Sequence, residues 1–206
     1  MISTGLRAGQ EEHLAERNKN IRQELILAGI QEINENGVTG FSIRRVAEAC
    51  NVSCAAPYRH FKDKREFIAA IIGYVNEQWR ERQVEVLDEV EKSGGGIRQK
   101  IVAVLVQYIR FLMDKPSYRS ILLLKDDQFD NIYHKMRGQL SSQSQLLEQE
   151  FFAQSGMDAA TQKRKLFTVR ALMFGAIFMF DTGELVYNDE TMKMIEYTVD
   201  REFDMP

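Results

Sequence analysis

Residues 39–64 read TGFSIRRVAEACNVSCAAPYRHFKDK, and the spacing of apolar residues in this stretch decides the fold of the amino-terminal part of the chain. Four apolar residues recur at i, i+3, i+4 and i+7, as one buried face of a short helix requires: Ile43, Val46, Ala47 and Cys50. Ser42 precedes this helix in the N-cap position, and Asn51-Val52 follows it as a turn. Ser53 caps a further helix, which we expect over Cys54–Phe61. Two short helices joined by a tight turn form a helix-turn-helix.

The flanking segments complete a small helical domain. A first helix is expected over Ile21–Asn36, where Asn36-Gly37 provides a left-handed cap signal. Its apolar stripe consists of Leu25, Ala28, Gly29 and Ile33. Asp63 opens a long helix, and the part over residues 64–92 is expected to connect two domains. Residues 1–20 are polar and balanced in charge, so we expect a flexible arm there.

Basic residues concentrate around the helix-turn-helix. Val38–Arg65 carries six basic and two acidic residues, a local charge of +4 in a chain whose net charge is −3. A compact basic surface suits contact with DNA. The small side chains of Cys54 and Ala55 permit close approach to a major groove, and Arg59 can donate two hydrogen bonds to a guanine edge. The residues placed to meet phosphates are Tyr58, His60 and Lys64.

Gly94-Gly95-Gly96 separates this region from a longer helical part. Further helices are expected near residues 97–114, 117–125, 129–155, 159–187 and 190–203. The chain has three prolines and no strand-like alternation, so the sequence predicts an all-α fold. We expect an amino-terminal three-helix helix-turn-helix domain at residues 21–65 and a larger carboxy-terminal helical domain at residues 66–206.

Residues 166–180 are apolar on nearly every helical face. A helix of this kind is covered by its own core and by a second subunit, because monomers rarely expose so much apolar surface. The helices near residues 159–187 and 190–203 are therefore expected to form half of a four-helix dimer interface. Small residues would let these helices approach one another: Ala171, Gly175 and Ala176.

Several other classes of protein are disfavoured. The two cysteines stand four residues apart, which is too poor a framework for a secreted disulfide scaffold. The start of the chain has no signal-peptide pattern, and the longest apolar run, residues 171–180, is about half of the roughly 20 residues that a membrane span needs. A cytoplasmic protein without membrane contact is expected. No catalytic motif or phosphate-binding loop stands out, so we predict no catalytic residue and no cofactor.

A metal site is also disfavoured. Asp130 and His134 stand at i and i+4, a spacing that can chelate a metal, and Asp126 and Asp127 lie one turn earlier. Further ligands are missing, so a solvated helix face is the favoured interpretation and no metal is predicted.

The helix-turn-helix resembles the DNA-binding domain of the TetR family of transcriptional regulators over about residues 21–75. The likeness rests on Thr39-Gly40-Phe41-Ser42-Ile43, Val46-Ala47, Val52-Ser53 and Ala56–Lys64. Pro57 departs from the pattern, because many relatives have a larger apolar residue there. A proline at this position can tilt the recognition helix.

The resemblance implies a homodimeric repressor that binds double-stranded operator DNA and is released by a small, mostly apolar ligand. It implies that the operator is lined by Arg44, Cys54, Ala55, Ala56, Tyr58, Arg59, His60 and Lys64, and we also predict DNA contacts for Ser42, Arg45 and Ser53. The ligand would bind in the carboxy-terminal domain, where the candidate pocket residues are Tyr108, Phe111, Phe129, Tyr133, Phe174 and Phe178. Ordinary core packing is the alternative interpretation for each of these aromatic residues.

A thiol redox-sensing DNA-binding regulator is the alternative function. Cys54 stands at a helix start near Arg59, a setting that can lower the pKa of a thiol. No resolving cysteine is evident, so an unreactive small residue that admits close approach of DNA is the favoured interpretation.

Overall fold

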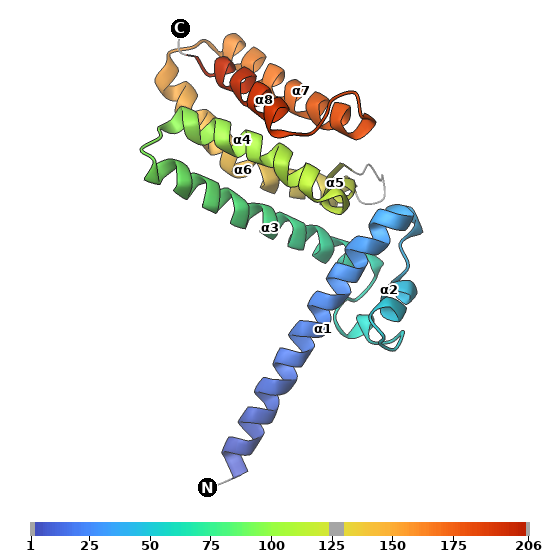
Figure 1. Ribbon diagram of the computed structural model, residues 1–206. Coiled ribbons are helices and arrows are strands. Elements are labelled where there is room, and N and C mark those ends of the chain that lie inside the picture. The colour runs from blue at the N-terminus through green and yellow to red at the C-terminus, as the bar shows by residue number, and fades with distance from the viewer. Residues whose placement is uncertain (1–2, 124–129, 205–206) are drawn as a thin grey trace. The chain divides into compact units, whose positions relative to one another are not determined.

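Helices account for the regular structure of the described residues. The computed structural model describes the backbone of residues 3–123 and 130–204 and the side chains of residues 19–121 and 143–204. The helices in chain order are α1 (Ser3–Gly40), α2 (Ile43–Ala49), a 3-10 helix η1 (Pro57–Arg59), α3 (Lys64–Lys92), α4 (Ile97–Asp114), α5 (Pro116–Leu123), α6 (Asp130–Ser155), α7 (Ala159–Thr182) and α8 (Asp189–Glu202) (Figure 1). The all-α prediction is confirmed. None of the helices in the described ranges is long and apolar enough to cross a membrane.

The chain divides into two compact units. Unit 1 comprises Met1–Val75 and Ser120–Tyr133, and unit 2 comprises Asn76–Arg119 and His134–Pro206. The division falls within α3, which supplies residues 64–75 to unit 1 and residues 76–92 to unit 2.

The core of unit 1 forms where α1 meets the first turns of α3. Leu25 and Ile33 of α1 are buried, and Gly29 lies between them on the same face. A Cβ atom at Gly29 would lie 2.6 Å from Ile71 Cδ1, so the glycine lets α1 approach α3 closely. Beside them the Phe67 ring stacks on Phe61 with the ring centroids 4.0 Å apart. The apolar stripe predicted for the first helix is thus its buried face.

The ends of α1 differ in how well the sequence predicts them. The helical run ends at Gly37, whose φ of 68° and ψ of 171° are non-helical, as the Asn36-Gly37 signal predicts. The helix begins at Ser3, so the predicted start at Ile21 is wrong. Residues 3–20 contain no proline, and the helix runs through them despite Gly5 and Gly9. The flexibility expected for residues 1–20 stays a prediction.

The turn of the helix-turn-helix closes as a Schellman motif. Val52 N–H donates to the Ala47 carbonyl at 3.0 Å, and Asn51 N–H donates to the Glu48 carbonyl at 3.1 Å. Asn51 has a φ of 54° and is the one non-glycine residue of the described chain with a positive φ. Asparagine accepts the left-handed region more readily than most residues, so it fits this turn.

The third helix was predicted to be an α-helix over Cys54–Phe61, and this prediction is wrong. Only Pro57–Arg59 is helical, as the 3-10 helix η1. Pro57 has no N–H to donate to the Ser53 carbonyl, and its ring crowds that carbonyl in an α-helix. The Ser53 carbonyl instead accepts from Ala56 N–H at 2.8 Å, which tightens the first turn. The segment is therefore a compact turn and not a regular helix.

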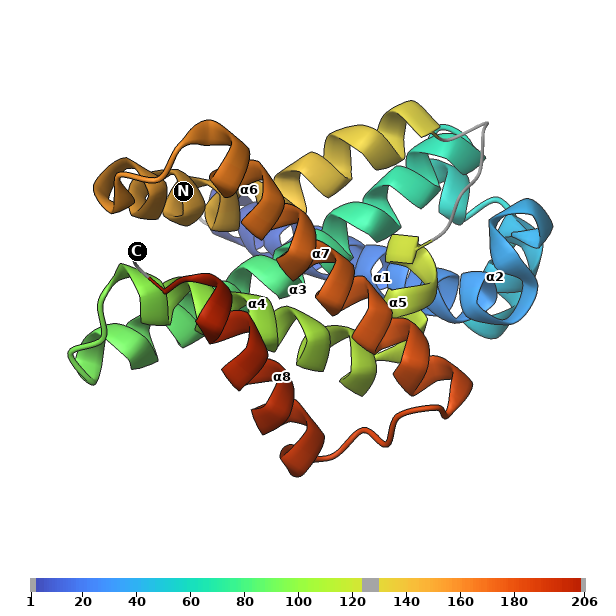
Figure 2. The same cartoon turned by 90° about the horizontal axis from the view of Figure 1, so that it is seen from above.

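The core of unit 2 is a helical stack. α7 and α8 pack on each other and on α4, and α4 lies between this pair and the part of α3 at residues 76–92 (Figures 1 and 2). Apolar side chains of α4, α7 and α8 fill the space between these helices, among them Ile109, Ile177 and Ile195. An ion pair joins α4 to α8, because Arg98 Nε and Nη2 donate to the two carboxylate oxygens of Asp200 at 2.7 and 2.6 Å.

Two expectations about the last helices need correction. α7 ends at Thr182 and not near residue 187, because Gly183 has a φ of 76° and forms a left-handed C-cap. Ala176 is buried in the core of unit 2, so it does not lie on an outer face as the predicted interface requires. The 3.6-residue period of α7 places Ala176 on the same face as Val169, Met173 and Phe180, which are also buried.

We predict that Asn51 stabilises the turn through its backbone conformation. Asn51→Ala should lower the free energy of unfolding by about 1 kcal/mol, since alanine pays a steric penalty in the left-handed region. Asn51→Gly is the matched control and should be at least as stable as the original chain. Urea denaturation followed by circular dichroism measures both. An alanine variant as stable as the glycine variant would contradict this account.

Candidate nucleic-acid interface

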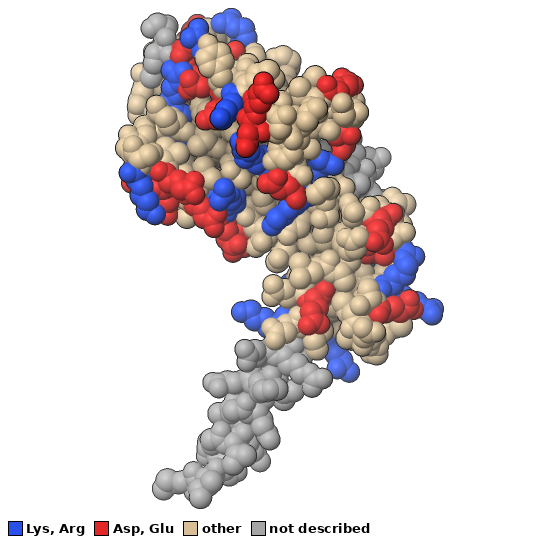
Figure 3. Space-filling model, in the orientation of Figure 1, with Lys and Arg blue, Asp and Glu red and all other residues tan. Residues whose placement is uncertain are grey.

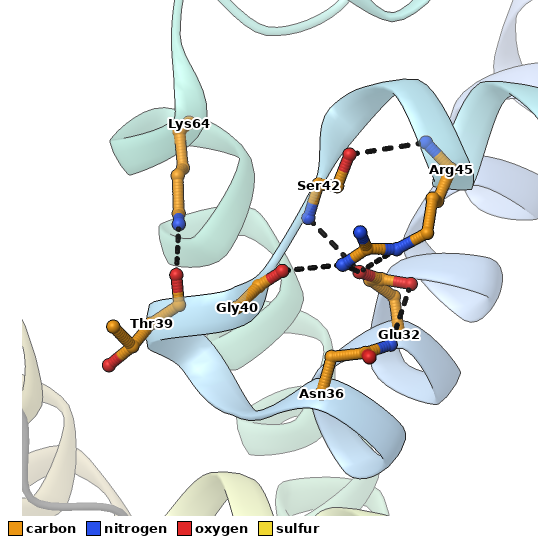
Figure 4. A network of polar contacts seen from close by, with 7 residues as sticks. All are labelled: Glu32, Asn36, Thr39, Gly40, Ser42, Arg45 and Lys64. Carbon is orange, nitrogen blue, oxygen red and sulfur yellow. Dashed lines mark hydrogen bonds and ion pairs between the residues drawn. The ribbon is translucent and has the colours of Figure 1, made fainter.

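A buried carboxylate organises the start of α2. Glu32 of α1 is 7% exposed, and its Oε1 accepts hydrogen bonds from Ser42 N–H at 3.1 Å and from Arg45 Nε at 2.9 Å (Figure 4). Its Oε2 accepts from Asn36 Nδ2 at 3.2 Å. We call Glu32, Asn36, Ser42 and Arg45 the Glu32 network. It joins α1, the following loop and the first turn of α2 at one point.

Ser42 and Arg45 were predicted to contact DNA, and both belong to this network. Ser42 Oγ accepts from Arg45 N–H at 3.4 Å, which is the expected N-cap bond. The Arg45 guanidinium donates to Glu32 and to the Gly40 carbonyl, the latter at 2.5 Å. The hydrogen bond that Arg45 donates to Glu32 raises the pKa of Arg45. The structure thus gives Arg45 a positioning role, because its polar atoms hold α2 against α1.

The sequence interpretation missed Glu32. The residue stands seven positions after Leu25 and one before Ile33, so it lies at the edge of the apolar stripe of α1. A carboxylate at a buried helical position needs hydrogen-bond donors. This break in the stripe was the signal that could have identified it.

Arg44 and the turn at residues 53–59 share an exposed surface. Arg44 points into solvent and pairs with Glu48, with Arg44 Nε 2.9 Å from Glu48 Oε1. Glu48 raises the pKa of Arg44, first through this hydrogen bond and then through its charge. The other exposed residues of this surface are Ser53, Cys54, Ala55, Tyr58 and Arg59, and Ala56 is half-buried. Basic side chains project from unit 1 into solvent (Figure 3).

His60 and Lys64 border the same turn. Burial, followed by the charges of Arg22 and Arg59, lowers the pKa of His60, so its ring is neutral at pH 7 and can donate one hydrogen bond. Lys64 Nζ donates to the Thr39 carbonyl at 3.2 Å and lies 5.9 Å from the centre of the Phe41 ring (Figure 4). An ammonium group has three donors, so Lys64 can bind this carbonyl and a phosphate together.

Residues 25–71, which contain this surface, match the family described as bacterial regulatory proteins, tetR family. This domain belongs to the TetR family. The resemblance inferred from residues 39–64 is therefore confirmed, and unit 1 contains the TetR-type domain. A search of curated proteins finds no match to the chain.

The whole chain has the fold of TetR regulators. A TetR family transcription regulator from Marinobacter aquaeolei VT8 matches with a TM-score of 0.70 and 16% identity, over 91% of this chain and 97% of that chain. The transcriptional regulator FadR from Bacillus subtilis, solved in complex with stearoyl-CoA, matches with a TM-score of 0.70 and 14% identity, over 88% of this chain and 96% of that chain. These likenesses confirm the predicted arrangement of a helix-turn-helix domain and a carboxy-terminal helical domain.

Of the aromatic residues predicted to line one ligand pocket, the four with described side chains lie in two different settings. Tyr108 and Phe111 of α4 contact Trp79, with ring centroids 5.1 and 5.3 Å away. Phe174 and Phe178 of α7 are 54% and 63% exposed, because the helical period turns them away from the buried face. The pocket prediction is wrong for these two. Phe129 lies outside the described residues, and Tyr133 lies outside the described side chains.

The structure gives little support to a metal site or to a redox-sensing cysteine. Asp126, Asp127, Asp130 and His134 lie outside the described side chains, and within those described no three acidic, histidine or cysteine residues could hold a metal ion. Both cysteines are free. Cys54 is exposed, and burial raises the pKa of Cys50. No contact of Cys54 in the described part favours redox sensing over a small side chain that admits DNA, so that hypothesis stays a prediction.

We predict that the Glu32 network holds α2 in place. Glu32→Leu should lower the free energy of unfolding by about 1–3 kcal/mol, since Ser42 N–H and the Arg45 guanidinium lose their acceptor. Glu32→Gln keeps an acceptor oxygen in the same place and should lose less. Chemical denaturation of the full chain compares the two variants. Equal stability of Glu32→Leu and the original chain would mean that the network stabilises nothing.

Proposed function

We propose that this TetR-family transcriptional regulator is a repressor that binds operator DNA as a homodimer and dissociates when a small molecule binds unit 2. The observation that carries the proposal is the exposed turn at residues 53–59 beside Arg44 and Lys64, within a TetR-type domain. Small side chains lead this turn and long polar ones end it. A major groove admits such a turn with its small residues closest to the bases.

The residues of this surface divide into three roles. Arg59 is exposed and reads a base edge through its two-pronged guanidinium. The DNA phosphates are contacted by Arg44, Tyr58, His60 and Lys64. These contacts fix the position of the domain on DNA but do not determine its sequence preference. Ser42 and Arg45 hold α2 in the required orientation. The backbone can approach the groove closely where the side chains are small, at Ser53, Cys54, Ala55 and Ala56.

The dimer interface is proposed to lie on the outer face of α7 and α8. Six large apolar side chains of these helices are exposed: Phe167, Phe174, Phe178, Met179, Met194 and Tyr197. An exposed apolar area of this size is unusual in a monomer and is typical of a protein–protein interface. A twofold-symmetric pair of these helices would cover both copies of the face.

Release from DNA requires a ligand that prefers the arrangement in which DNA does not bind. α3 is one continuous helix and contributes to both units, so a ligand that shifts α3 in unit 2 also changes its first turns beside the DNA surface. By linkage, operator DNA weakens ligand binding by the same factor, typically about 5–150-fold. The FadR neighbour was solved with stearoyl-CoA, which supports a partly apolar ligand for this fold.

The salt dependence of DNA binding tests the proposed function. Fluorescence anisotropy with labelled fragments of the surrounding genome should find a near-palindromic site bound by one dimer. Affinity should fall by about 10³–10⁵-fold between roughly 50 and 200 mM salt, as expected for some 6–10 phosphate contacts. Absence of binding at every fragment, or binding that salt does not weaken, would refute the proposal.

We predict that Arg59 and Lys64 affect DNA binding differently. Arg59→Ala should relax the preference at one base position, where a two-pronged contact discriminates by about 1–3 kcal/mol. Lys64→Ala and Tyr58→Phe should weaken operator and unrelated DNA by equal factors. Lys92→Ala at the end of α3 removes the same charge from an exposed residue of unit 2 and is the control. If Arg59→Ala weakens all sequences equally, Arg59 is a phosphate contact.

We predict that Phe174→Arg and Phe178→Arg produce monomers. Each places a charge at the centre of the exposed α7 face, where a dimer would have to bury it without a partner. Light scattering after size-exclusion chromatography measures the mass. Leu146→Arg on α6 is the matched control, because Leu146 is an exposed apolar residue on another helix. A dimer that survives both substitutions together would place the interface elsewhere.

A further inference from the structure

α3 carries two amide side chains at positions where a helix normally buries apolar ones. Asn76, Trp79 and Gln83 stand at i, i+3 and i+7, so they share one face. Asn76 and Gln83 are each 5% exposed, which is as buried as many apolar core residues of the same unit. Trp79 between them is also buried and is the one tryptophan of the chain.

Three polar atoms of these amides have no hydrogen-bond partner among the described residues. The atoms without a partner are Asn76 Nδ2, Asn76 Oδ1 and Gln83 Nε2. Buried polar groups in native proteins are almost always hydrogen-bonded. A buried donor or acceptor loses its hydrogen bonds to water, and this costs free energy unless a new partner replaces the water. Two donors and one acceptor on one helix face therefore indicate a missing partner that has both an acceptor and a donor.

The amides border a cavity that such a partner can enter. The cavity has a volume of about 150 Å³ and lies within unit 2. Its described wall combines the two amides with the Trp79 ring, the apolar side chains of Val84 and Leu87, and a third amide, that of the exposed Gln143 on α6. Arg80 also borders it, but its guanidinium is exposed to solvent and pairs with Glu77 at 2.5 Å. No buried charge of the described wall faces the cavity.

We infer that this cavity binds a small uncharged molecule with an apolar body and one polar group that both accepts and donates hydrogen bonds, such as a carboxamide or a lactam. Asn76 and Gln83 bond the polar group, and Trp79, Val84 and Leu87 contact the apolar body. A charged group would lose its hydration on entering the cavity, and no opposite charge of the described wall would compensate for this loss. The cavity is also smaller than the roughly 300–1,000 Å³ of pockets for drug-sized ligands, so a molecule as large as an acyl-CoA does not fit within it.

This inference deepens the proposed function, because it names the class of the releasing ligand and places its polar contact on α3. The same helix supplies Lys64 to the DNA surface, twelve residues before Asn76. The ligand that bonds the amides thus acts on the helix that the proposed release requires to move.

Three probes of one shape test the ligand class without DNA. Cyclohexanecarboxamide has the required polar group, methylcyclohexane lacks it, and cyclohexanecarboxylate replaces it with a charge. Trp79 borders the cavity, so its fluorescence reports occupancy directly. The carboxamide should produce a saturable change and bind about tenfold more tightly than either other probe, as expected for hydrogen bonds to otherwise unpaired groups. Asn76→Leu should remove this preference.

The stability of the free protein gives a second, independent measurement. Asn76→Leu and Gln83→Leu should raise the Tm, since each replaces unpaired buried polar atoms with apolar ones of similar size. Gln78→Leu is the matched control on the same helix, because the Gln78 amide already donates to Glu81 at 2.9 Å, and its removal should not raise the Tm.

Two results would overturn the inference. A lower Tm for Asn76→Leu would mean that the protein itself bonds this amide. A carboxamide that binds no more tightly than methylcyclohexane would mean that the amides select no polar ligand, whatever the change in Tm. Neither measurement involves DNA, so failure of the ligand site and failure of the proposed regulator are distinguished by the anisotropy titration.

Discussion

A carboxylate that leaves water must receive hydrogen bonds from the protein, and this constraint on Glu32 determines how the amino-terminal helices meet. Its two oxygens need donors, and the donors come from Asn36 on its own helix, from the backbone of Ser42 and from Arg45. Ser42 is also the N-cap of α2. The bonds that satisfy the carboxylate therefore fix where α2 begins and how it lies against α1. A purely apolar contact at this point would hold α2 with less directional control.

Pro57 adds a second constraint at the other end of the motif. It removes one backbone donor and shortens the recognition segment to a 3-10 helix, while Phe61 N–H still donates to the Pro57 carbonyl at 2.9 Å. Phe61 then anchors the turn by stacking on Phe67. The exposed residues from Cys54 to Arg59 are thus held between a capped helix and an aromatic contact. Their backbone is defined even though the segment lacks a regular α-helix.

The periodic features of the fold could be predicted from the sequence, and the features that depend on tertiary contacts could not. Apolar spacing predicted α2 and the buried stripe of α1, and Asn36-Gly37 predicted where the helical run of α1 ends. The helix predicted over Cys54–Phe61 did not form because of one proline. The spacing of apolar residues carries no information about the backbone N–H that proline lacks. Phe174 and Phe178 were expected inside because aromatic residues are usually buried, but residue type does not tell which face of α7 meets α4. Arg45 was interpreted as a DNA contact because its partner, Glu32, lies thirteen residues away on another helix.

The two polar features of this fold affect its stability in opposite ways. Glu32 is buried and fully bonded, so it specifies one arrangement of unit 1. Asn76 is equally buried but unbonded in the described structure, so it raises the free energy of the arrangement in which the cavity is empty. A ligand that bonds Asn76 lowers that free energy only for arrangements of α3 that aim the amide at it. Lys64 belongs to the same helix, twelve residues before Asn76. The placement of an unsatisfied amide on this helix, and not on α4 or α7, is what links occupancy of the cavity to the residues that would contact DNA.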